Sequence, residues 1–88
     1  MAWTIEITGK AEKSLRKLDP QWQKAIYTFF ENELYTNDNP RRKGKALTGN
    51  LAGLWRYRVG DYRILCHIDD SYLVILVLDI GHRKEIYR

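Results

Sequence analysis

Residues 54–69 read Leu-Trp-Arg-Tyr-Arg-Val-Gly-Asp-Tyr-Arg-Ile-Leu-Cys-His-Ile-Asp, and this stretch decides how the chain folds. Aromatic and β-branched residues stand on both sides of Gly60-Asp61, a pattern typical of two strands joined by a tight turn. Glycine as the first turn residue favours a two-residue type II′ turn, which fixes the register of the strands. The opposed pairs are then Val59 with Tyr62, Arg58 with Arg63, Tyr57 with Ile64, Arg56 with Leu65, and Trp55 with Cys66.

This register predicts a hairpin with two different faces, because successive side chains of a strand point to opposite sides. Arg56, Arg58 and Arg63 share one face. Like charges directly across a strand pair destabilise it by about 0.2–1 kcal/mol, so a face selected only for stability would avoid them. We interpret the cluster as a site for a polyanion; the alternative is three ordinary solvated arginines. The other face, expected to pack on helices, carries Trp55, Tyr57, Val59, Ile64 and Cys66.

A strand and two helices are expected before the hairpin. Residues 3–7 alternate apolar and polar side chains, which predicts a short strand. Apolar residues recur at helical spacing over residues 11–18 and predict a short helix. Asp19-Pro20 suits the start of a new helix, which we expect from about Pro20 to Tyr35. The two helices would form a helical hairpin.

The rest of the C-terminal half is predicted to be a loop and one more strand. Residues 41–53 contain basic residues and glycines without a clean period, so they predict a loop. Residues 72–80 are almost entirely apolar, as an interior strand would be. Its register stays open by one residue. The helix-facing set is either Leu73, Ile75 and Val77 or Val74, Leu76 and Leu78.

These elements predict one α+β domain over residues 1–88, in the order β-α-α-β-β-β. A small, mostly antiparallel four-stranded sheet would pack on the N-terminal helical hairpin. Hydrophobic residues make up 44% of the chain, which excludes bulk disorder. The longest apolar run is too short to cross a membrane, and the N-terminus does not resemble a signal peptide. One cysteine excludes an internal disulfide, so we expect a cytoplasmic protein without a membrane partner.

Positive charge is concentrated in the second half of the chain. Residues 1–40 hold five Lys or Arg against six Asp or Glu, whereas residues 41–88 hold ten against five. Most of these basic residues are arginines, whose planar fork suits phosphate groups. An anionic partner is expected, and nucleic acid is the commonest one. The candidates for contacts to an RNA backbone are Arg41, Arg42, Lys43, Lys45 and Lys84.

The C-terminal residues 81–88 supply the candidates for proton transfer. Histidine is the residue type best suited to proton transfer near neutrality, which makes His82 a candidate, and arginines near Tyr87 would lower the pKa of its phenol. Phosphate-binding glycine motifs and metal-ligand spacings are absent from the sequence, and Cys66 and His67 are interpreted as structural. A reaction on a phosphodiester without metal or cofactor fits this set, and attack by a 2′-hydroxyl would require RNA.

Three segments, residues 45–58, 61–63 and 81–87, resemble the consecutive signatures of the RelE/ParE superfamily of bacterial toxin–antitoxin toxins, and the RelE branch more closely. The resemblance spans nearly the whole chain. It implies a ribosome-dependent endoribonuclease that cleaves mRNA in the decoding site, leaves a 2′,3′-cyclic phosphate and is neutralised by a cognate antitoxin. The family's functional positions match Arg56, Arg58, Arg63, Arg83 and Tyr87.

One departure concerns proton transfer. The type member of the RelE branch has lysines where this chain has Arg56 and Arg58, and an arginine cannot lose its proton in a protein. We therefore expect these two residues to bind phosphate and stabilise charge. Tyr87 is then the first candidate base and His82 the second, while Arg83 would contact the scissile phosphate or assist the leaving group.

Two other functions remain open from the sequence. ParE-branch toxins share the fold but inhibit DNA gyrase and are not nucleases. A non-catalytic nucleic-acid-binding module would use Trp55, Tyr57 and Tyr62 to stack on bases, and this requires exposed rings. The predicted register turns Trp55 and Tyr57 toward the helices, which argues against stacking.

Overall fold

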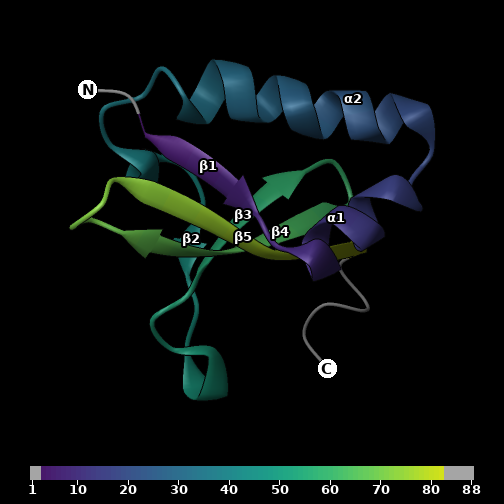
Figure 1. Ribbon diagram of the computed structural model, residues 1–88. Coiled ribbons are helices and arrows are strands. Elements are labelled where there is room, and N and C mark those ends of the chain that lie inside the picture. The colour runs from purple at the N-terminus through teal and green to yellow at the C-terminus, as the bar shows by residue number, and fades with distance from the viewer. Residues whose placement is uncertain (1–2, 83–88) are drawn as a thin grey trace.

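A computed structural model describes residues 3–82 of the chain as two helices packed on a five-stranded mixed sheet (Figure 1). In chain order the elements are β1 (Thr4–Ile7), α1 (Gly9–Arg16), α2 (Pro20–Phe29), β2 (Lys45–Ala46), β3 (Trp55–Val59), β4 (Tyr62–Asp69) and β5 (Val74–His82). The sheet order is β1-β5-β4-β3-β2, and only the β1–β5 pair is parallel. The α+β class and the interior position of the last strand are confirmed. Within residues 3–82, no helix is both long and apolar enough to cross a membrane.

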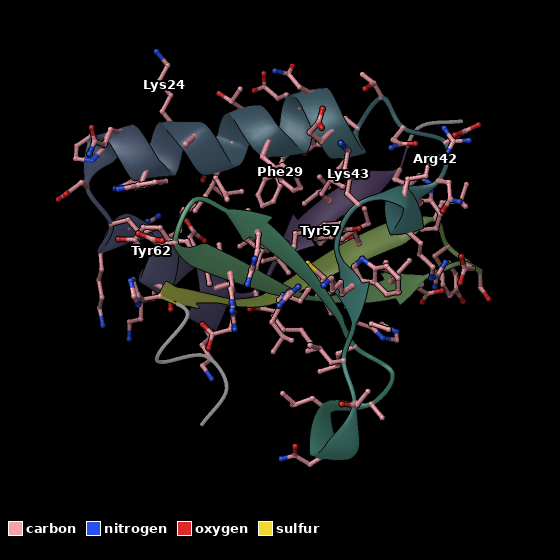
Figure 2. The ribbon with its side chains drawn as sticks, turned by 180° about the vertical axis from the view of Figure 1, so that it is seen from behind. Lys24, Phe29, Arg42, Lys43, Tyr57 and Tyr62 are labelled. Carbon is pink, nitrogen blue, oxygen red and sulfur yellow. The ribbon has the colours of Figure 1, made fainter. Side chains whose placement is uncertain are left out.

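The two faces of the sheet have different surroundings. Figure 1 shows α2 lying across one face, while the loop between β2 and β3 extends away on the opposite side. Phe29 of α2 points toward Tyr57 of β3, and Lys24 points away from the sheet (Figure 2). We call the side away from α2 the open face.

The β3–β4 hairpin has the predicted register at every pair from Trp55–Cys66 to Val59–Tyr62. Gly60 has a φ of 59° and is the only turn residue in the left-handed region, as a type II′ turn requires. A side chain at this position would collide with the indole ring of Trp22. Glycine therefore serves both the turn and the close contact with α2.

The prediction that residues 41–53 form only a loop is wrong, and the sheet has five strands instead of four. Lys45 and Ala46 pair with Arg56 and Trp55 as the short strand β2. Two turns of 3-10 helix, Pro40–Arg42 and Gly49–Leu51, flank it. A strand of two residues carries no periodic signal, which is why the sequence did not indicate it.

The last strand also differs from its prediction at both ends, since it begins at Val74 and continues to His82. The carboxylate of Asp69 accepts hydrogen bonds from the amides of Ser71 and Tyr72, and Leu73 has a φ of 55°. These features lengthen the turn that precedes β5. Ile75 and Val77 face the helices, which resolves the open register.

A β-bulge then changes which side chains of β5 are buried. Cys66 pairs with Val77 but its neighbour Leu65 pairs with Asp79, so one residue of β5 is inserted between the two pairs. The inward positions after Val77 consequently move to Ile80, which is 2% exposed. The buried core is Trp3, Ala11, Leu15, Ile26, Phe30, Leu34, Tyr57, Ile64, Cys66, Ile68, Ile75, Val77 and Ile80.

Tyr57 is the largest fully buried side chain among the described residues, and its hydroxyl contacts the loop that precedes β2. Its ring lies 5.5 Å from that of Phe29, and its hydroxyl donates a 2.7 Å hydrogen bond to the carbonyl of Pro40. Burial raises the pKa of the phenol, so the neutral form is retained in the folded protein. This hydrogen bond joins the core to residues 40–44, which we call the basic loop.

We predict that Tyr57→Phe lowers the free energy of unfolding by about 1–2 kcal/mol at pH 7, because the buried carbonyl of Pro40 loses its donor. The raised pKa means that the stabilisation by Tyr57 is complete below the ordinary tyrosine pKa of about 10 and declines above it. The difference between wild type and variant should therefore shrink in urea titrations above pH 10. Tyr27→Phe, at an exposed site on α2, is the control, and an equal loss in both variants would contradict the assignment.

Candidate functional site

Four basic side chains gather on the open face, which we call the basic face: Lys45, Arg56, Arg58 and Arg63. Strand pairing sets Arg58 opposite Arg63 and Lys45 opposite Arg56. The three arginines are where the hairpin register predicts them, and β2 adds Lys45. Gly81 of β5 is the partner of Arg63 on its other side, so no side chain crowds that arginine from β5.

Three of the four side chains of the basic face have no acidic partner among the described residues. None of the ion pairs found between residues 3 and 82 involves Lys45, Arg56 or Arg58. The Nε atom of Arg56 is buried and has no hydrogen-bond partner in that range. A buried donor without a partner costs about 1–3 kcal/mol. This surface therefore carries an electrostatic cost that an incoming anion would relieve.

In the neighbouring basic loop, by contrast, the basic side chains are paired with acids. Both terminal nitrogens of Arg41 lie 2.9 Å from the two carboxylate oxygens of Asp70. This pair raises the pKa of the Arg41 guanidinium and lowers the pKa of the Asp70 carboxyl. The guanidinium of Arg41 also lies 6.0 Å from the centre of the Trp55 ring. Arg41 thus holds the loop against the sheet.

Arg42 and Lys43 are also engaged by acids. Arg42 lies 3.6 Å from the carboxylate of Asp38, and Lys43 lies 3.1 Å from that of Glu33. Figure 2 shows both side chains near the C-terminal end of α2, which a π-helical turn, Phe30–Leu34, continues. Of the predicted backbone-binding residues within 3–82, the structure brings only Lys45 onto the basic face. Lys84 lies outside the described residues.

Gly44 positions the strand that supplies Lys45, and the sequence reading did not single it out. Its φ is 78°, and a Cβ there would collide with the carbonyl oxygen of Arg56 and lie 2.6 Å from Nε1 of Trp55. The indole instead donates a 2.8 Å hydrogen bond to the carbonyl of Lys43. A glycine between basic residues was the available signal, because only glycine adopts this φ without strain.

Two hollows border the basic face. The larger, about 230 Å³, is lined by Phe29, Lys43, Gly44, Lys45, Arg56, Tyr57 and Arg58. The smaller, about 90 Å³, is lined by Arg58, Gly60, Asp61 and Arg63 at the hairpin turn. Arginine side chains line both hollows and lysines line the larger one, so this surface can bind phosphate groups and stabilise charge that develops on them.

The candidate residues for proton transfer are not on the basic face within the described chain. His82 pairs with Tyr62, whose ring lies 6.0 Å from the imidazole and 5.1 Å from Trp22 of α2. His82 therefore stands on the helix-facing side of the sheet. Arg83 and Tyr87 lie outside the described residues.

The remaining predictions concern packing. Cys66 is completely buried and its thiol pKa is raised by burial, which confirms it as a core residue. Tyr57 is also completely buried, and Trp55 is half-buried beneath the basic loop. Tyr57 cannot stack on a nucleobase without rearrangement, and neither ring is fully exposed as a base-stacking module would require.

Comparison with known proteins agrees with this architecture. A family model for the ParE toxin of the type II toxin–antitoxin system parDE matches residues 5–87. The chain belongs to the RelE/ParE superfamily of type II toxins. Toxin RelG of Mycobacterium tuberculosis (strain ATCC 25618 / H37Rv) is 38% identical over 88 residues, which cover all of this chain and 99% of RelG.

Other relatives place this RelE/ParE-family chain nearer to RelE toxins. Toxin RelE of the same M. tuberculosis strain is 34% identical over 84 residues, covering 96% of this chain and 84% of that toxin. The crystal structure of the M. tuberculosis toxin–antitoxin complex RelBE2 contains a chain that is 35% identical, with a TM-score of 0.85. The match covers 94% of this chain and 100% of that one.

We predict that Arg58→Gln stabilises this family member, because Arg58 stands directly opposite Arg63. The free energy of unfolding at low salt should rise by about 0.2–1 kcal/mol, and the gain should shrink in high salt as the repulsion is screened. Urea titrations at two salt concentrations measure both effects. Arg16→Gln, which removes a 2.6 Å contact with Glu12 on α1, should give no such gain. A loss of stability in Arg58→Gln would show that the basic face is not repulsive.

Proposed function

We propose that this RelE/ParE-family toxin is an endoribonuclease that cleaves mRNA in the decoding site of the ribosome. The observation that carries the proposal is the basic face, where Lys45, Arg56 and Arg58 have no acidic partner within residues 3–82. The adjacent residues Arg41, Arg42 and Lys43, by contrast, each form an ion pair with an acid. Such a distribution fits a surface reserved for an external polyanion.

The reaction needs a nucleophile that the RNA itself supplies. The ribose 2′-oxygen attacks the adjacent phosphorus, the bond to the 5′-oxygen breaks, and a 2′,3′-cyclic phosphate remains. One proton leaves the 2′-hydroxyl and one reaches the departing 5′-oxygen. Arg56, Arg58 and Arg63 would bind the non-bridging oxygens and stabilise the charge that grows on them in the transition state.

The proton must be moved by another group, since an arginine keeps its proton. We propose Tyr87 as the base, because arginines beside its phenol would favour the phenolate. Arg83 would contact the scissile phosphate or assist the departing oxygen. His82, on the helix-facing side beside Tyr62, is less suited to the base role than Tyr87.

The partners follow from the same proposal. The mRNA is the substrate and the ribosome presents it, while a cognate antitoxin neutralises the toxin by covering the basic face. The M. tuberculosis relative of known structure was crystallised as a toxin–antitoxin complex, which supports an antitoxin partner for this chain.

Inhibition of DNA gyrase is the second candidate, and one observation favours it. The matching family model is that of the ParE toxin of parDE. The two curated relatives carry RelE-type names and the basic face suits a phosphodiester, so we rank mRNA cleavage first.

We predict that Arg56→Ala and Arg63→Ala each slow cleavage about 100-fold or more, the usual cost of removing one charge-stabilising donor. Primer extension on a defined message in a purified translation system, with and without ribosomes, measures this. Arg83→Ala and Tyr87→Phe should also abolish the cut. Arg16→Ala on α1 is the matched control and should cleave normally. Full toxicity of the arginine variants, or gyrase inhibition by a folded protein that makes no cut, would overturn the nuclease proposal.

A further inference from the structure

The open face continues past the basic face into a region of opposite character. Along β4, the outward residues run in the order Arg63, Leu65, His67 and Asp69. The strand therefore passes from a guanidinium through an apolar residue and an imidazole to a carboxylate. Six residues of strand at about 3.3 Å each separate the two charged ends by about 20 Å.

A pocket of about 310 Å³ occupies the acidic end. Its lining residues, which we call the acidic pocket, are Glu6, His67, Asp69, Tyr72, Val74 and Leu76. Leu76 pairs with both Glu6 and His67, and Val74 pairs with Asp69, so three adjacent strands build one continuous surface. The pocket has an apolar floor and a carboxylate on each side.

The ring of Tyr72 is not part of the hydrophobic core, so core packing does not explain an aromatic residue at this position. The residue is 79% exposed, the largest exposure among the large hydrophobic residues at positions 3–82. Val74 and Leu76 beneath it are only half-buried. Exposed tyrosines beside apolar floors are frequent anchor points of protein–protein interfaces. The ring therefore marks a place where a partner side chain can be enclosed.

The charges of the pocket exclude RNA and favour a peptide. Within the described residues, no ion pair involves Glu6 or Asp69. Oδ1 of Asp69 accepts hydrogen bonds from the amides of Ser71 and Tyr72 in its own turn, which leaves Oδ2 available to a partner. Two carboxylates would repel phosphate groups, whereas they suit a lysine or arginine side chain.

We propose that the acidic pocket anchors a segment of the cognate antitoxin, an inference that rests on the proposed toxin function. This segment would place an apolar side chain over Val74 and Leu76, with a basic side chain toward Glu6 and Asp69. It would then continue across Leu65 with acidic side chains over the basic face. About six extended residues, or about four turns of helix, span the distance.

This arrangement separates antitoxin binding from RNA cleavage. RNA would use only the basic face, while the antitoxin would use both ends of the open face. Substitutions in the acidic pocket should therefore release the toxin from its antitoxin without removing its activity.

The test measures both properties on the same purified proteins. Tyr72→Ala and Glu6→Lys should each weaken binding of the recombinant cognate antitoxin at least 10-fold in isothermal titration calorimetry. Ribosome-dependent cleavage should stay within about two-fold of wild type. The matched controls are Tyr27→Ala on α2 and Glu31→Lys on the π-helical turn Phe30–Leu34 that follows α2, both at exposed positions, and both should bind normally. Far-UV circular dichroism and thermal unfolding confirm that each variant is folded.

Unchanged antitoxin affinity in both pocket variants would overturn the proposal. So would a loss of cleavage with unchanged antitoxin affinity, since the pocket would then face the ribosome. Weakened antitoxin binding by a wild-type fold that cleaves no RNA would support the pocket and reject the nuclease function, so the two failures are distinguishable.

Discussion

The contact between Gly60 and the indole of Trp22 is the constraint on which the rest of the structure depends. It fixes a two-residue turn beneath α2, and the turn fixes the register of β3 and β4. That register buries Tyr57, Ile64 and Cys66 under the helices. Because side chains alternate along a strand, the same register sends the arginines to the open face. Core packing and the concentration of positive charge are therefore two consequences of one turn.

Charge pairing divides the basic residues into two groups with different roles. Arg41, Arg42 and Lys43 bind Asp70, Asp38 and Glu33, and they fix the loop that leads to β2. The basic face differs, because none of the ion pairs found within residues 3–82 involves Lys45, Arg56 or Arg58. Repulsion on this face lowers stability, which is expected where a surface is selected for binding. The open face is therefore positively charged at one end and negatively charged, in the acidic pocket, at the other. A peptide with the complementary charge order could bind along it.

The sequence predicted the hairpin and the arginine cluster because a two-residue turn leaves no freedom in register. It could not predict β2, whose pairing depends on the conformation of Gly44 and on contacts with Trp55. The bulge opposite Leu65 was equally hidden, since Thr8 at the start of α1 binds the carbonyl of Leu78 across the fold. Pairing of Arg41 with Asp70 joins residues 29 positions apart, so the sequence could not show that this part of the basic run also holds the loop against the sheet.

The central claim is that this fold presents the basic face to an RNA whose own 2′-hydroxyl is the nucleophile. Ribosomes programmed with a message that carries a single 2′-deoxynucleotide at the cleaved position test it most directly. We expect the toxin to cut the all-ribose message, leaving a 2′,3′-cyclic phosphate detectable by mass spectrometry, and to leave the substituted message intact. Equal cleavage of both messages, or cleavage of neither by the folded toxin, would contradict the claim.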